Sequence, residues 1–145
     1  MPGYGIQEDT RNVLPWSWAV DLLNRVRNPV LGTVRPDGRP HAMPLWGLWL
    51  GDAYCMSTAI TSVKSENLKA NDRCVITAGD GDDAVVLEGK AELSELPVGF
   101  TEAYKKKYGE TIDEGPIWIV RPTVAFAFQA TEDFSKTATR WVFEA

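Results

Sequence analysis

Ser57-Thr58-Ala59-Ile60-Thr61-Ser62-Val63-Lys64-Ser65-Glu66-Asn67-Leu68 is the most informative stretch of the chain. It lies between two apolar, strand-like runs, and Thr61 or Ser62 is a suitable N-cap for a helix. Asn71-Asp72 is a natural helix stop, so we predict about two helical turns over residues 62–70. We therefore expect a strand, a hydroxyl-rich loop and a short helix in succession.

The start of this helix suits an anion. The first N–H groups of a helix lack main-chain acceptors, and the helix dipole places partial positive charge beside them. Lys64 has the wrong sign for that dipole, at a cost of about 0.3–1 kcal/mol that a bound anion would reverse. We interpret residues 57–64 as an anion-binding loop. The alternative is a solvent-exposed connection in which Glu66 compensates Lys64.

Composition places limits on the whole chain. At 145 residues it fits one domain, 1–145, and 44% hydrophobic with 24% charged residues is ordinary for a soluble globular protein. The net charge of -5 and the lack of a basic stripe argue against a nucleic-acid partner. Residues 1–12 are polar and lack the apolar core of a signal peptide, and no stretch approaches the ~18 apolar residues of a membrane span. We therefore expect a cytoplasmic protein without a membrane partner.

Few residues are available for metal or triad chemistry. Cys55 and Cys74 lie far apart in strand-like contexts, which indicates reduced, buried thiols and argues against a zinc site. His41 is the only histidine, which excludes a Ser-His-Asp triad and multi-histidine metal sites. We expect His41 at the surface or at an interface, and no metal.

The order of apolar patterns predicts a mainly β (α+β) fold. A helix is expected over about 15–27, followed by a barrel over about 29–145. Pro36-Asp37-Gly38 predicts a hairpin turn between residues 30–35 and 39–50. The other expected elements are strands over 53–57, 74–78, 84–93 and 137–143, a helix over 97–108, and residues 117–120 and 123–129 as a strand pair or one bent strand. These are six to eight antiparallel strands with two to three short helices.

The chain resembles the split β-barrel flavoproteins, which include pyridoxamine-phosphate-oxidase-like and deazaflavin (F420)-dependent oxidoreductases. The motifs that carry the resemblance are Leu31-Gly32-Thr33-Val34, Pro36-Asp37-Gly38-Arg39-Pro40, Ser57, Lys64-Ser65-Glu66-Asn67-Leu68 and Val86-Leu87-Glu88-Gly89-Lys90-Ala91. The resemblance implies an FMN-binding type of split β-barrel, and a homodimer with cofactor sites at the subunit interface.

The same resemblance implies which residues bind the cofactor. In that family a strand-end Ser and a Lys seven residues later contact the cofactor phosphate, and Ser57 and Lys64 match both positions. The cofactor-binding residues that it implies are Ser57, Thr58, Ala59, Ser62, Lys64 and Asn67 around the loop, Pro44, Leu45 and Trp46 along the ring system, and Arg140 and Trp141 near the end of the chain.

One departure separates the branches of the family. Pyridoxamine-phosphate oxidases carry a basic strand before the loop, but residues 52–57 contain no Arg or Lys, which argues against vitamin B6 oxidation. The F420-using branch resembles the chain better. F420 bears a phosphodiester and a polyglutamate tail, and Arg35, Arg39, Lys69 and Arg73 are candidates to meet that tail.

The sequence thus predicts an F420H2-dependent reductase of a small conjugated or quinone-like molecule. Four alternatives stay open: an FMN-dependent oxidoreductase, a non-catalytic F420 carrier, a haem-binding relative, and a dimer module without ligand. Tyr54, Tyr104 and Tyr108 are possible proton donors that nothing distinguishes, so no catalytic residue is named.

Overall fold

The computed structural model describes residues 14–129 and 137–143. Within these ranges the chain forms three helices and eight strands, in agreement with the sequence. In chain order they are α1 (Trp16–Arg25), β1 (Val30–Val34), β2 (Pro40–Pro44), β3 (Trp46–Leu50), β4 (Ala53–Ser57), α2 (Val63–Ala70), β5 (Arg73–Asp80), β6 (Asp83–Ser94), α3 (Phe100–Tyr108), β7 (Ile117–Gln129) and β8 (Thr139–Val142).

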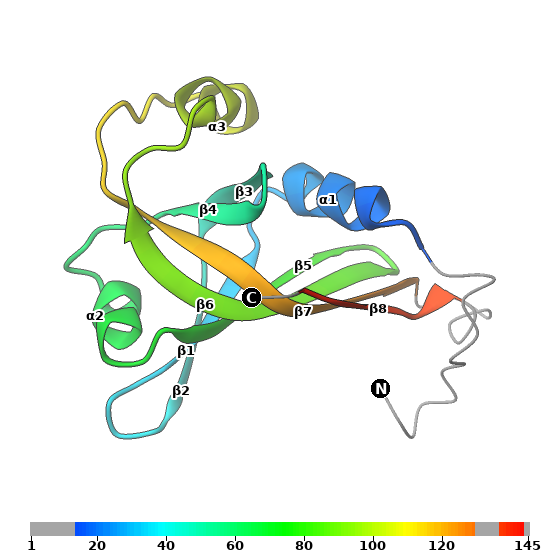
Figure 1. Ribbon diagram of the computed structural model, residues 1–145, viewed down its shortest axis with the longest axis horizontal. Coiled ribbons are helices and arrows are strands. Elements are labelled where there is room, and N and C mark those ends of the chain that lie inside the picture. Colours follow the sequence, from blue (N-terminus) through cyan, green and yellow to red (C-terminus); the bar gives the residue numbers. More distant parts are fainter. Residues whose placement is uncertain (1–13, 130–136, 144–145) are drawn as a thin grey trace.

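The strands form one curled antiparallel sheet (Figure 1). Their spatial order is β2-β1-β5-β6-β7-β4-β3, and β8 pairs with β7 outside this path. β2 and β3 are thus the two ends of the hydrogen-bonded path, although they are neighbours along the chain. This is the split β-barrel that the sequence predicts, and its seam lies between β2 and β3.

Leu45 marks a correction to the sequence prediction. One continuous strand was expected over residues 39–50, but β2 ends at Pro44 and β3 begins at Trp46. The Leu45 N–H donates to the carbonyl oxygen of Pro29 at 2.9 Å, and its side chain is 5% exposed in the barrel core. The chain turns a corner here because Leu45 leaves the ladder and enters the core.

β7 is one bent strand rather than a strand pair. Its register against β6 shifts at Gly89, which pairs with Pro122. A Cβ on Gly89 would collide with the carbonyl oxygen of Arg121, so this close approach requires glycine. Pro122 is tolerated inside a long strand because the ladder is irregular at this point.

Two hydrophobic clusters fill the fold. The first lies inside the curled sheet and is covered by α1, where Trp16 packs edge-on against Trp49, Trp141 and Phe143. The second lies between α3 and the outer side of β3, β4 and β7. Its buried members are Leu48, Ala53, Cys55, Phe100, Tyr104, Tyr108, Ile117 and Ile119.

Both cysteines are buried free thiols, as expected. Within the described ranges, no helix has the length and apolar composition to cross a bilayer.

Candidate functional site

The loop that we interpret as an anion-binding loop, residues 57–64, joins β4 to α2 and is held by a chain of hydroxyl groups. Ser62 is the N-cap of α2, and its Oγ accepts a hydrogen bond from the Ser65 N–H at 3.1 Å. Ser62 Oγ also lies 3.2 Å from the hydroxyls of Thr58 and Ser65. Ser65 Oγ donates to the carbonyl oxygen of Ala59 at 2.6 Å. The loop is therefore shaped by its own side chains before any ligand arrives.

Two N–H groups at the start of α2 remain available. The N–H of Ser65 is capped, whereas those of Val63 and Lys64 have no acceptor within the described part of the chain. Lys64 itself makes no ion pair with a described residue, and its side chain is half-buried. Free N–H groups and an uncompensated ammonium at one helix start form an environment that favours an anion.

Positive charge gathers opposite this helix start, on the β1–β2 hairpin. His41 lies opposite Thr33 in the β1–β2 register, and Thr33 accepts a hydrogen bond from Asn67 of α2 at 3.0 Å. The pKa of His41 is lowered, first by burial and then by the charges of Arg35 and Lys64. Nδ1 of His41 and Nε of Arg35 are buried nitrogen atoms without a hydrogen-bond partner among the described residues.

A cavity of about 320 Å³ lies between the hairpin and α2. We call it the hairpin pocket; its lining residues are Arg35, Pro36, Asp37, Arg39, Val63 and Asn67. Its volume is in the range of small-molecule sites. Asn67 reaches this pocket while its amide stays bonded to Thr33, so it holds the hairpin against α2. The pocket and the loop together form the candidate site.

Ser57 does not point into the hydroxyl chain. It interacts with the phenol of Tyr104 on α3, and it is the register partner of Trp46. Residues Ala53 and Cys55, which share its face of β4, pack against α3. Thr58, one residue later, points instead toward Ser62. Ser57 and Thr58, both predicted to bind the cofactor, therefore point in different directions, Ser57 toward α3 and Thr58 toward the start of α2.

The three residues predicted along the cofactor ring system differ in solvent exposure; they are Pro44, Leu45 and Trp46. Pro44 is exposed at the end of β2, whereas the Leu45 side chain is in the core. The Trp46 ring stacks on Tyr108, with centroids 4.6 Å apart, and its Nε1–H donates to Asn28 at 3.0 Å. Trp46 is thus fixed by α3 and the residues after α1, and it presents one partly exposed ring.

Arg140 and Trp141 lie far from the loop within one chain. β8 and α2 are at opposite ends of the molecule (Figure 1). Arg140 is exposed, with its guanidinium 6.0 Å from the centroid of the Phe126 ring, and Trp141 packs on Trp16. The structure therefore brings together the residues around α2 and the hairpin, but it does not bring β8 to them.

The four predicted tail-binding cations also differ. Arg39 pairs with Asp37 at 2.8 Å, and Lys69 pairs with Glu66 at 3.0 Å. Arg73 is exposed at the start of β5. Arg35 has no ion pair with a described residue and lines the hairpin pocket. Of the four, Arg35 is the one whose charge, with that of Lys64, lowers the pKa of His41.

The three tyrosines are poor acids in this structure. Burial is the first cause of a raised pKa in each of them. The Tyr54 hydroxyl is buried without a partner among the described residues. The Tyr108 hydroxyl accepts from the Gly47 N–H and lies 2.9 Å from the carbonyl oxygens of Arg27 and Gly47. Tyr108 therefore acts as a packing and hydrogen-bonding element.

Sequence reasoning missed the cluster of His41 and Arg35 with Lys64. His41 was expected at the surface or an interface, and Arg35 only at a cofactor tail. The missing signal was the hairpin register: His41 pairs with Thr33, so His41 and Arg35 share the face that meets α2. A two-strand alignment around Pro36-Asp37-Gly38 would have placed both residues there.

Comparison with known proteins agrees with the fold. A family model described as pyridoxamine 5'-phosphate oxidase matches residues 19–138. A solved structure named F420 reductase is 28% identical, covers 72% of this chain and 93% of its own, and has a TM-score of 0.59. No curated protein matches the chain.

Two further solved structures share the fold at low identity. An FMN-binding, pyridoxamine 5'-phosphate oxidase-related protein from Nostoc punctiforme PCC 73102 is 14% identical, covers 91% of this chain and 98% of its own, and has a TM-score of 0.62. A haem-binding protein from Mycobacterium smegmatis is 18% identical, covers 86% of this chain and 56% of its own, and has a TM-score of 0.63. With the family match over residues 19–138, the chain belongs to the pyridoxamine 5'-phosphate oxidase family of split β-barrel proteins.

Proposed function

We propose that this protein is an F420-dependent oxidoreductase that reduces a small conjugated or quinone-like molecule. The observation that carries the proposal is the positive charge of Lys64 at the start of α2, which makes no ion pair with a described residue and, together with Arg35, lowers the pKa of His41. Its likeness to a protein named F420 reductase, over 93% of that protein's chain, supports the choice of cofactor. The family as a whole supports an oxidoreductase.

The residues around the loop fit a phosphate-bearing cofactor. Lys64 supplies a charge, the N–H groups of Val63 and Lys64 supply donors, and charge-assisted hydrogen bonds contribute roughly 1.5–3 kcal/mol each. Thr58 and Ser62 hold the loop in shape, and the exposed Ala59 leaves room beside it. When bound, F420 supplies hydride chemistry, while the protein orients the reactants and excludes water.

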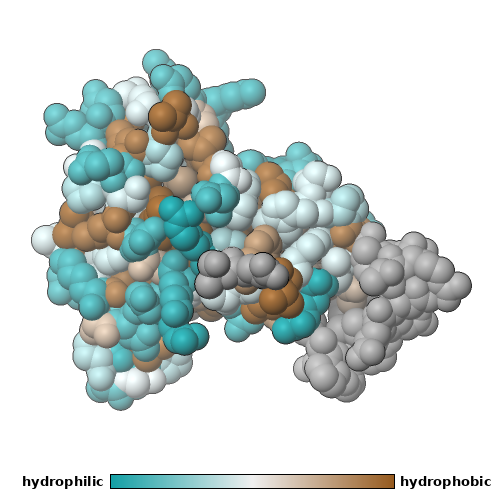
Figure 2. Space-filling model, viewed as in Figure 1, coloured by the Kyte–Doolittle hydropathy of each residue, from teal (hydrophilic) through white to brown (hydrophobic). Residues whose placement is uncertain are grey.

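The proposed assembly is a cytoplasmic homodimer. Met43 and Val63, beside the hairpin and the loop, are 46% and 53% exposed. Figure 2 shows apolar surface in the region between α3 and α2. Exposed apolar side chains next to a polar site favour cover by a partner subunit or a cofactor ring. In such a dimer, Arg140 and Trp141 would serve the site of the partner subunit, because they lie far from the loop of their own chain.

FMN is the second candidate cofactor, and one observation favours it. Its terminal phosphate carries more charge than a phosphodiester and requires a more basic site. Arg35 and His41 add positive or protonatable groups to Lys64, and the sequence alone did not bring them together. A carrier that binds either cofactor without turnover is the third candidate, and a turnover assay separates it from the enzymes.

Equilibrium binding tests the proposal. F420, FMN and haemin are titrated separately into the parent protein, Lys64→Ala and Lys105→Ala. Lys105 is an exposed lysine on α3 and so is a charge-matched control. We expect F420 to bind more tightly than FMN, and Lys64→Ala to weaken F420 binding by about tenfold or more. The Lys105→Ala protein should bind like the parent.

The other possible results of these titrations would favour a different cofactor or a different function. Tighter binding of FMN would transfer the proposal to a flavin-dependent enzyme. Binding of F420 without oxidation of F420H2 by enones or quinones would indicate a carrier. If neither F420 nor FMN binds, the assignment of the loop as an anion site is wrong, and binding of haemin in that case would favour the haem-binding alternative.

A further inference from the structure

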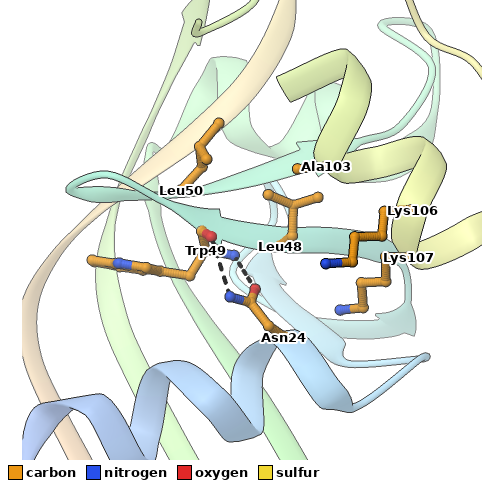
Figure 3. A pocket seen from close by; sticks show the side chains of 7 residues that line it. All are labelled: Asn24, Leu48, Trp49, Leu50, Ala103, Lys106 and Lys107. Carbon is orange, nitrogen blue, oxygen red and sulfur yellow. Dashed lines mark hydrogen bonds between the residues drawn. The ribbon is translucent and has the colours of Figure 1, made fainter. Parts of the chain in front are cut away.

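A second cavity lies between α1, β3 and α3, away from the anion-binding loop (Figure 3). Its volume is about 420 Å³, within the range of small-molecule sites. One wall is apolar and is formed by Leu48 and Leu50 of β3 with Ala103 of α3. None of its lining residues belongs to the loop or to the hairpin pocket.

Asn24, the side chain that α1 contributes to the cavity, is already hydrogen-bonded to the main chain of β3. Asn24 Oδ1 accepts from the Trp49 N–H at 2.8 Å, and its Nδ2 lies 3.4 Å from the Trp49 carbonyl oxygen. This pair fixes α1 on β3 and leaves little of the amide for a ligand. The free polar chemistry of the cavity therefore comes from the α3 side.

Two consecutive lysines provide that chemistry. The Nζ atoms of Lys106 and Lys107 both point into the cavity (Figure 3). Lys107 Nζ donates to the carbonyl oxygens of Gly47 at 2.7 Å and Leu23 at 3.1 Å. An ammonium group has three N–H donors, so one remains. Neither lysine makes an ion pair with a described residue.

The surroundings of Lys107 contain no compensating negative charge among the described residues. Burial and the nearby charge of Arg27 lower the pKa of Lys107 to about 8, so it is still mostly protonated at pH 7. Its Nζ lies 5.1 Å from the centroid of the Tyr108 ring, and Lys106 adds a second cation. The cavity thus combines an apolar wall with two cations that make no ion pair with a described residue.

We propose that this cavity binds a small monocarboxylic acid with an apolar body, its carboxylate between Lys106 and Lys107 and its body against Leu48 and Leu50. A neutral ligand would leave the half-buried ammonium group of Lys107 without a counter-charge. An inorganic anion would leave the apolar wall in contact with water. A carboxylate on an aliphatic or aromatic body satisfies both features of the cavity. The site is independent of the proposed cofactor function.

Titration with hexanoate, followed in ¹H–¹⁵N spectra of the full chain, tests the proposal. Hexanol is the neutral probe and acetate is the probe without an apolar body. We expect saturable shifts at Asn24, Ala103 and Lys106 with hexanoate, and roughly tenfold weaker binding of the other two probes. Equal binding of hexanol, no saturable shift, or shifts confined to the α2 loop would overturn the assignment.

A charge-matched pair of variants tests the lysines. Lys106→Glu should weaken hexanoate binding by about tenfold or more, and Lys105→Glu on the same helix should leave it unchanged. Both lysines are exposed on α3, so we expect both variants to keep the fold. Lys107→Met should abolish binding, and affinity in the parent should fall as the pH rises through about 8, since Lys107 then loses its proton. Equal effects of Lys105→Glu and Lys106→Glu would refute the site.

Discussion

The indole Nε1–H of Trp118 donates a hydrogen bond to Ser65 Oγ at 2.9 Å and thereby ties β7 to the first turn of α2. Ser65 is fully buried, and the same oxygen donates to the Ala59 carbonyl at 2.6 Å. One hydroxyl therefore connects the barrel wall, the helix and the loop of residues 57–64. The position of the loop depends on a residue that a ligand does not need to touch.

Ser65→Ala should destabilise the protein by about 2 kcal/mol, because it leaves the Trp118 N–H and the Ala59 carbonyl without a partner. Urea unfolding followed by circular dichroism measures the change. Ser17→Ala, at an exposed position of α1, is the matched control and should stay within about 0.5 kcal/mol of the parent. Equal midpoints for the two variants would mean that water replaces the hydroxyl at no cost.

His41 gives a direct probe of the charge at the loop, because it is the only histidine in the chain. Its pKa is lowered by burial and by Arg35 and Lys64, so we expect an NMR titration midpoint below 6.5. Lys64→Ala should raise that midpoint, and so should a bound phosphate-bearing ligand, because each reduces the positive field. Lys105→Ala should not change it. A midpoint that is insensitive to Lys64 would separate His41 from the site.

The same shift has a consequence for stability. The folded protein binds a proton at His41 less readily than the unfolded chain does, whose histidine titrates near 6.5. The unfolded state therefore holds more protons as the pH falls through that value, and acidification through this range should destabilise the fold. Replacing His41 with Gln should reduce the slope of the unfolding free energy between pH 7 and about 5. An unchanged slope would assign the acid sensitivity to other groups.

Gly47→Ala should destabilise the protein by about 2–3 kcal/mol through overpacking. A Cβ at this position would lie 2.6 Å from Tyr54 Cε1 and 2.7 Å from the Cys55 carbonyl oxygen. Gly79→Ala is the matched control, since its Cβ would meet its nearest atom, the Asp83 carbonyl oxygen, at 3.7 Å. Thermal unfolding of both variants checks the prediction, and a tolerated Gly47→Ala would show that β3 can shift.

The two thiols should be inert in the folded protein. Burial is the first cause of the raised pKa of both, about 11 for Cys55 and about 12 for Cys74, and the charges of Asp52 and Asp72 add to it. A thiol reagent such as Ellman's reagent at pH 8 should modify neither thiol in native protein and both after denaturation. Rapid labelling of the native state would reveal local opening of β4 or β5.

The sequence predicted both ends of α2, because a helix cap and a helix stop depend on residues that are close together in the chain. Ser62 caps α2 and Asn71 ends it, as the sequence indicates. The same reasoning could not find the corner at Leu45, because Pro44, Leu45 and Trp46 are all compatible with a strand, and the break depends on a contact with Pro29. The sequence around Pro122 was compatible with two strands or with one bent strand. The bulge at Gly89 lets β7 continue through Pro122 as one strand.

The candidate site was predictable only in part. Lys64 and the hydroxyls of Thr58 and Ser62 follow from the loop sequence. The direction of Ser57 depends on which face of β4 meets α3, and the proximity of His41 depends on the hairpin register. These are tertiary properties, since a side chain on a strand faces one side or the other according to how the sheet is covered.

The contact of Trp16 with Trp141 and Phe143 bears on how the protein is made. α1 leaves the ribosome early, but part of the surface that covers it belongs to β8 and the residue after it, which are synthesised more than a hundred residues later. Until then the indole of Trp16 lacks Trp141 and Phe143, two of the three aromatic rings that it contacts among the described residues. Completion of the fold therefore waits for the C-terminal strand, and the nascent chain carries an exposed aromatic helix that a chaperone can recognise.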